Sequence, residues 1–110
     1  MKYSANLIKK TMSAIDNHPL HSFWNIHKTG QYDDIEICEI RFENLDKVQM
    51  NISISKNEVN AIVYTDDECK QFKWLGSCNL DKITGDQYMM WLGIKLDQMY
   101  RLADDIAEYS

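Results

Sequence analysis

The sequence has few residues that interrupt a chain or separate domains. It contains one proline and four glycines in 110 residues, with no Pro/Gly/Ser-rich linker, low-complexity tract or internal repeat. The absence of linkers and repeats argues against a tandem or solenoid architecture. Because a chain of this length with 45% hydrophobic residues can bury a core without disulfides or metal, we predict one domain spanning residues 1–110.

Paired cysteines and long apolar runs are also lacking. Cys38, Cys69 and Cys78 are odd in number and have no CxxC spacing, which favours reduced thiols over a disulfide framework. No apolar run reaches membrane-spanning length, and the first residues lack the apolar block of a signal peptide. We therefore predict a cytoplasmic protein with no membrane partner.

Positive charge is scarce. The 12 Lys and Arg residues are outnumbered by 17 Asp and Glu residues, which gives a net charge of −5. Since nucleic-acid binding depends on neutralising phosphates, this balance argues against direct nucleic-acid binding and favours a basic partner. The acids gather at Asp33-Asp34, at Asp66-Asp67-Glu68 and at Asp104-Asp105. Such groups are either solvated charges near turns and helix ends, or parts of a surface that docks on a basic groove.

Motifs for catalysis and cofactor binding are absent. The sequence has no Walker-type glycine loop, no GxGxxG and no nucleophile elbow. His18, His21 and His27 have no matching His or Cys pair at zinc-finger spacing, so we interpret them as ordinary loop histidines. We therefore predict no enzyme activity, no cofactor and no metal, with a histidine-based site as the alternative.

The clearest pattern present is an amphipathic stretch from Thr84 to Tyr109. Thr84 and Gln87 have the spacing of a capping box, which predicts the start of a helix. The apolar residues that follow recur three and four positions apart, on one helical face: Met89, Leu92, Leu96, Met99, Ala103 and Ile106. We predict that this stripe packs on the chain's own sheet, with dimerisation through part of it as the alternative.

The middle of the chain is rich in strand-like segments. The candidate strands lie at about 22–28, 35–43, 47–55, 58–64 and 69–75. The three central segments are separated by short polar connections, which predicts two consecutive hairpins. Gly76-Ser77 is expected to end the last strand. A first helix is predicted over residues 4–17, with Ser4 as its N-cap, ending at His18-Pro19.

Side-chain alternation in the two hairpins predicts one apolar sheet face. Pairing Phe42 with Val48 and Ile54 with Val59 places the apolar residues of all three strands on the same side, which we expect both helices to cover. The opposite face is mixed, with Ile37, Ile62 and Tyr64 where a solvated face should be polar. Those residues are either covered by neighbouring segments or form a partner-binding patch.

These patterns together predict an α+β fold. We expect a mainly antiparallel four- to five-stranded meander with an N-terminal helix and a long C-terminal helix packed on one face. Small acidic domains of this type include immunity proteins, secretion chaperones and phage-encoded nuclease inhibitors, which is an analogy of fold alone. The excess of lysine over arginine and the many Asn and Ile residues suggest an AT-rich source, such as a phage or mobile element.

The leading functional hypothesis is a small acidic protein-binding module. It would be an inhibitor or immunity-type protein that blocks a basic or nucleic-acid-binding surface of a partner such as a nuclease or toxin, in the host cytoplasm if phage-encoded. The residues assigned to partner binding are Ile37, Ile62, Tyr64, Asp66, Asp67, Asp33 and Asp34. The alternatives are a homodimeric structural or chaperone-like protein and a small metal- or ligand-dependent enzyme.

Overall fold

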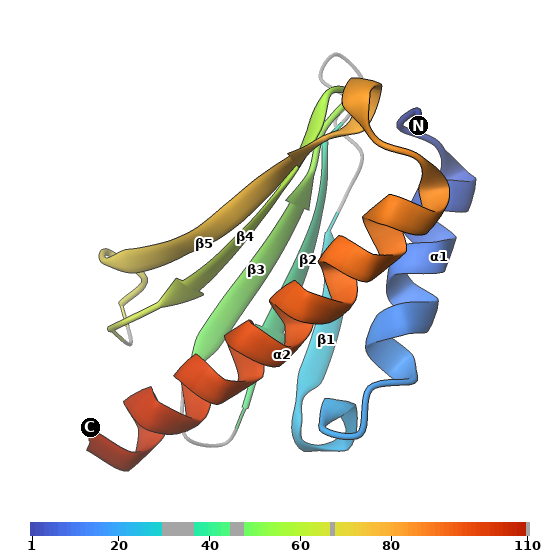
Figure 1. Cartoon of the computed structure of the whole chain (residues 1–110). Coiled ribbons are helices and arrows are strands. Elements are labelled where there is room, and N and C mark those ends of the chain that lie inside the picture. The colour runs from blue at the N-terminus through green and yellow to red at the C-terminus, as the bar shows by residue number, and fades with distance from the viewer. Residues whose placement is uncertain (30–36, 45–47, 67, 110) are drawn as a thin grey trace.

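The chain folds into a five-stranded antiparallel sheet with two α-helices on one of its faces (Figure 1). This computed structural model describes residues 1–29, 37–44, 48–66 and 68–109. The arrangement confirms the predicted α+β fold with N-terminal and C-terminal helices. The elements are α1 (Ala5–Asp16), η1 (His21–Phe23), β1 (Asn25–Thr29), β2 (Cys38–Glu43), β3 (Gln49–Ile54), β4 (Glu58–Tyr64), β5 (Phe72–Asn79), η2 (Leu80–Lys82) and α2 (Gly85–Tyr109).

The sheet is a simple meander in which each strand pairs with the next one along the chain. The predicted register of β3 and β4 is confirmed, because Ile54 lies opposite Val59. The register predicted for β2 and β3 is wrong by two residues, since Phe42 pairs with Met50 and not with Val48. A shift of two keeps every side chain on its predicted face, so the single apolar face is still correct.

The loop between β2 and β3 explains this shift. The backbone N–H of Asn44 donates to the carbonyl of Val48 at 3.3 Å, and the Val48 N–H donates to the Asn44 side-chain oxygen at 3.0 Å. Asn44 and Val48 therefore close the connection instead of extending the two strands. Asparagine is favoured in such positions because its side chain can bond nearby backbone groups.

Strand β5 continues past the glycine that was expected to end it. Ala61 pairs with Gly76 but Ile62 pairs with Trp74, so Leu75 is the extra residue of a β-bulge. Gly76 has φ 140°, which favours glycine, and a Cβ at this position would lie 3.1 Å from Lys95 Cε. Gly76 therefore lets the strand bend and continue. At the other edge, β1 begins later than predicted because residues 21–23 form a 3-10 turn.

Both predicted helix starts are confirmed. The Ser4 hydroxyl accepts the N–H of Leu7 at 3.1 Å at the start of α1. At the start of α2, the Thr84 N–H donates to Gln87 Oε1 at 3.0 Å, and the Gln87 N–H donates to Thr84 Oγ1 at 3.2 Å. This reciprocal pair is a capping box, which satisfies two backbone N–H groups that the helix itself cannot bond.

One core lies between the sheet and the helix layer, in which α2 crosses β3, β4 and β5 and α1 packs beside α2 (Figure 1). The two helices are joined by a buried polar contact. The Thr11 hydroxyl donates to the Leu7 carbonyl at 2.8 Å, so the Tyr88 hydroxyl donates to Thr11 Oγ1 at 2.7 Å. Tyr88 and Thr11 are fully buried, and each satisfies the other.

Replacing Ile52 with Asp should unfold the protein. Ile52 is fully buried between Ile40 and Ala61 in the centre of the sheet, where a carboxylate would have no partner. We expect a loss of at least about 4 kcal/mol of unfolding free energy. Chemical denaturation followed by circular dichroism measures it. Lys56→Asp, in the exposed β3–β4 turn, is the matched control and should leave the denaturation midpoint nearly unchanged.

Thr84→Ala should cost about 1 kcal/mol of unfolding free energy, because it removes the acceptor of the Gln87 N–H. Gln87→Ala removes the reciprocal bond, so the two substitutions should be non-additive in a double-mutant cycle. Fully additive losses would show that the two residues do not act as one capping box.

Candidate functional site

The face of the sheet opposite the helices carries one set of alternating side chains from all five strands. The register places five of these residues in a continuous row across the strands: His27, Arg41, Asn51, Ile62 and Trp74. Because α1 and α2 both lie on the other side, neither helix covers this row (Figure 1). We call this surface the open face.

The open face becomes aromatic at the β4–β5 edge. Ile62, Tyr64, Phe72 and Trp74 form what we call the aromatic patch, in which Ile62 pairs with Trp74 and Tyr64 pairs with Phe72. The rings of Tyr64 and Phe72 meet edge to face at 6.4 Å between centroids. Phe72 is 58% exposed and Trp74 is 57% exposed, although they are among the largest apolar side chains in the chain.

A chain of side-chain hydrogen bonds orients Trp74. Its indole N–H donates to Asn60 Oδ1 at 3.1 Å, and Asn60 Nδ2 donates to Glu58 Oε1 at 2.9 Å. The indole is therefore held in place by a polar contact while much of its surface remains in water. Such a side chain presents a preformed contact surface.

Acidic residues occur beside the aromatic patch and farther along the open face. Glu58 lies on β4 and accepts a hydrogen bond from Asn60, whereas Glu39 lies two strands away on β2, where it forms an exposed ion pair with Arg41 at 3.5 Å. The β4–β5 turn adds Glu68, whose carboxylate is paired with the ammonium of Lys70 at 2.6 Å. Glu68 and Lys70 thus balance each other, while Lys73, between Phe72 and Trp74 on β5, is an exposed basic residue at the same edge.

Asp66 has a structural role in the same turn. Its carboxylate accepts the backbone N–H of Lys70 at 3.0 and 3.2 Å and that of Gln71 at 3.0 Å. These bonds fix the turn that brings β5 back alongside β4, as Asp side chains commonly do.

The predicted partner-binding residues do not all come together. Ile62, Tyr64 and Asp66 are neighbours on β4 and its turn, whereas Ile37 precedes β2, two strands away across the sheet. Asp33, Asp34 and Asp67 lie outside the described residues. Phe72 and Trp74 were not included in the predicted site, because the long connection between β4 and β5 does not fix their register with β4 from the sequence alone. The sequence did contain one signal for them: Phe72 and Trp74 alternate around Lys73, as two side chains on the same face of a strand would.

Asn51 is the buried polar residue of the open-face row. Its side chain is only 5% exposed, and Oδ1 has no hydrogen-bond partner in the described part of the chain. An unsatisfied buried acceptor costs about 1–3 kcal/mol. Because this oxygen is buried, a partner docked on the surface would not reach it.

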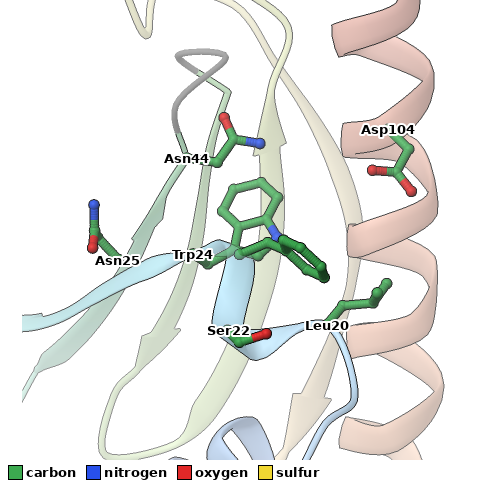
Figure 2. Close-up of a pocket in the computed structure, with 7 residues that line it drawn as sticks. Leu20, Ser22, Trp24, Asn25, Asn44 and Asp104 are labelled. Carbon is green, nitrogen blue, oxygen red and sulfur yellow. The ribbon is translucent and has the colours of Figure 1, made fainter.

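A second candidate site is a cavity of about 630 Å³ at the end of the sheet near the second half of α2. Figure 2 shows Trp24 between Leu20 and Asn44, with Asp104 on the facing helix. The lining residues are Leu20, Ser22, Phe23, Trp24, Asn25, Asn44 and Asp104. The volume suits a small ligand, but the side chains of Ser22, Asn25 and Asp104 are exposed. Water competes for them, so the lining selects no particular ligand.

The aromatic side chains behind this cavity pack around Tyr100. Its ring lies 4.6 Å from that of His18, 5.7 Å from that of Trp24 and 6.1 Å from that of Phe42, between centroids. Tyr100 is 1% exposed and its hydroxyl has no hydrogen-bond partner among the described residues. This cluster anchors the segment after α1 to α2 and the sheet.

His18, Cys38 and Cys78 are held by hydrogen bonding or by burial. His18 accepts the Leu20 N–H through Nδ1 at 3.2 Å, so its Nε2–H donates to Asp97 Oδ1 at 2.7 Å. Burial raises the pKa of the Cys38 and Cys78 thiols, which makes both poor nucleophiles at neutral pH. Within the described ranges, no three His, Cys, Asp or Glu side chains gather as a metal site.

Comparison of the chain with protein-family models, with curated proteins and with solved structures found no match. None of the helices in the described residues has the length and hydropathy needed to cross a membrane. Function is therefore inferred from the surfaces of the molecule and their chemistry.

The two buried tyrosines of α2 should make the fold sensitive to alkali. Burial raises the pKa of Tyr88 to about 12, and burial also raises the pKa of Tyr100. An unfolded tyrosine ionises near pH 10, so the stabilisation is complete below pH 10 and is lost as the pH rises towards 12. We expect unfolding free energy to fall by about 1.4 kcal/mol per pH unit for each tyrosine in this window.

Phenolate absorbance, recorded alongside circular dichroism, measures this effect. Two of the six tyrosines should ionise only together with unfolding, and Tyr88→Phe should reduce the alkaline loss. Titration of all six near pH 10 in folded protein would contradict the expectation.

Proposed function

We propose that this chain is a small acidic protein-binding module, an inhibitor or immunity-type protein that occupies a basic surface of a partner protein. The observation that carries the proposal is the aromatic patch, where Phe72 and Trp74 remain more than half exposed on an uncovered sheet face. Exposed aromatic side chains that gather in one place are typical of interaction sites, and Trp and Tyr are enriched among residues that dominate binding energy.

The rigidity of the patch supports this function. Its residues lie on paired strands, Tyr64 and Phe72 brace each other, and the bond to Asn60 orients Trp74. A surface that is already ordered loses little conformational entropy when a partner binds. The patch can therefore contribute affinity without a change in the fold.

The distribution of charge supports a basic partner. The chain has a net charge of −5, and the carboxylate of Glu58 lies beside the patch on β4, where it accepts a hydrogen bond from Asn60. Complementary charge accelerates association and fixes orientation. A nucleic-acid-binding or catalytic surface of a nuclease or toxin has the matching positive charge, whereas a nucleic acid would be repelled.

The proposed place of action is the cytoplasm, that of the host cell if the gene belongs to a phage or mobile element. The three cysteines are all unpaired thiols, as expected in a reducing compartment. Two of them, Cys38 and Cys78, are buried in the core, so their oxidation would disturb packing.

The test is affinity capture from a nuclease-treated lysate of the native host, with wild type and two variants compared at low and high salt. Phe72→Ser with Trp74→Ser removes the patch. Phe23→Ser, at the cavity, is the matched control because Phe23 is also an exposed aromatic, at 71%. Wild type and control should retain the same basic protein, less of it at high salt.

The affinity for the recovered partner should fall at least about 30-fold in the double variant. Titration calorimetry with purified proteins measures this, and thermal unfolding checks that every variant is folded. The proposal fails if no specific partner is retained, or if the folded double variant binds as tightly as wild type.

A further inference from the structure

The two outermost strands of the sheet each have one side without a neighbouring strand. In the described part of the chain, β1 pairs only with β2 and β5 pairs only with β4. The N–H of Thr65 donates to the carbonyl of Gln71 at 3.0 Å, which sets the phase of the β4–β5 ladder. Because bonded and non-bonded pairs alternate, the backbone groups of Phe72 and Trp74 point away from β4. Such free groups can pair with a strand of another molecule.

The composition of the β4–β5 ribbon favours this kind of pairing. Phe72 and Trp74 are exposed on β5, and residues 59–65 of the adjoining ribbon carry no charge. Segments of this length that are rich in aromatic and β-branched residues, with little charge and no proline, readily associate as extra strands. Lys73 is the only charged residue among residues 71–80 of the sequence. It is therefore the one charge that β5 places against such association.

Lysine is also the exception on the face of the sheet that the helices cover. Lys28 on β1 lies opposite Ile40, and Lys73 on β5 lies opposite Val63. Since Ile40 and Val63 are fully buried, both lysines belong to the apolar side of the sheet. Among the five described strands, these two are the only charged residues on that side. Each edge strand has one, and the three inner strands have none.

The two lysines hold their charges at the rim of the core. Lys28 and Lys73 are exposed, and neither forms an ion pair within the described ranges. Burial raises the pKa of the Cys38 thiol, and the positive charge of Lys28 opposes this rise, which places that charge close to a core residue. The bulge at Leu75 also interrupts the β5 ladder. Inward-pointing lysines and bulges are means by which edge strands avoid pairing.

We propose that Lys28 and Lys73 keep the two edges of this sheet unpaired, above all towards a second copy of the chain. A strand added to β5 would remove water from the Lys73 ammonium, and β5 of a second copy has no carboxylate to offer in return. In a continuous sheet built from two β5 strands, both Lys73 side chains would lie on the same face and repel each other.

This role goes beyond the proposed binding function and does not rest on it. Phe72 and Trp74 lie on the open face of β5, whereas Lys73 lies on the opposite face. The lysine therefore protects the edge without covering the aromatic patch. An edge strand can then expose large apolar side chains in a protein that stays monomeric.

The experiment is sedimentation velocity over a wide range of protein concentration, with wild type, Lys28→Val and Lys73→Val. Wild type should sediment as a monomer. Each valine variant should form dimers or larger species at concentrations at least about tenfold below any at which wild type does so. Both changes make the net charge more negative than −5, so weaker overall repulsion cannot explain association. Thermal unfolding checks that each variant is folded.

Two control variants and one further measurement make the test specific. Lys56→Val removes the same charge from the exposed β3–β4 turn and should stay monomeric. Lys73→Glu keeps a charge at the edge and should also stay monomeric. Amide hydrogen exchange should show the N–H groups of Phe72 and Trp74 protected only in the associated Lys73→Val protein, because they point to the free edge.

Several results would overturn the proposal. A monomeric Lys73→Val protein would remove the role assigned to β5, and a monomeric Lys28→Val protein would remove that of β1. Equal association of Lys56→Val or Lys73→Glu would show that the edge charge is not the cause. Association of Lys73→Val that leaves the Phe72 and Trp74 amides unprotected would show that another surface is used.

Discussion

The burial of one sheet face beneath α2 is the constraint on which the rest of this structure depends. A meander of this size has no second sheet to pack on, so its apolar residues stay in water unless a helix covers them. Leu92 and Met99 are completely buried against this face, and each such side chain contributes about 1.5–3 kcal/mol. The capping box at Thr84 and the contact between Tyr88 and Thr11 set where α2 begins and how α1 lies beside it.

The same arrangement leaves two surfaces without a cover. Placing both helices on one side exposes the other face of the sheet, and a helix of 25 residues that buries one side presents the other side to solvent. Both uncovered surfaces carry apolar residues, Trp74 on the sheet and Met90 on the helix, where burial inside the chain cannot account for them. The proposed partner contact uses the surface on the sheet.

The reactive side chains of this protein differ from its charged side chains in where they lie. His18 is held by Asp97 and Leu20, and the thiols of Cys38 and Cys78 are buried with raised pKa values. His18 links the segment after α1 to α2, and the two thiols are packed in the core. The exposed charges, in contrast, lie on both helices, on the sheet and in its turns, where they can steer and orient a partner.

Local patterns in the sequence determined both helices, their N-caps, the two central hairpins and the identity of the apolar face, because helical period, strand alternation and capping are local properties. Only the tertiary structure decided the β2–β3 register, which depends on how Asn44 closes the loop. It also decided the extent of the aromatic patch. Phe72 and Trp74 pair with Tyr64 and Ile62 across a long connection, so their register with β4 is not visible in a local pattern. Sequence alternation therefore located Ile62 and Tyr64 on the open face, whereas the pairing of β4 with β5 was needed to place Phe72 and Trp74 beside them.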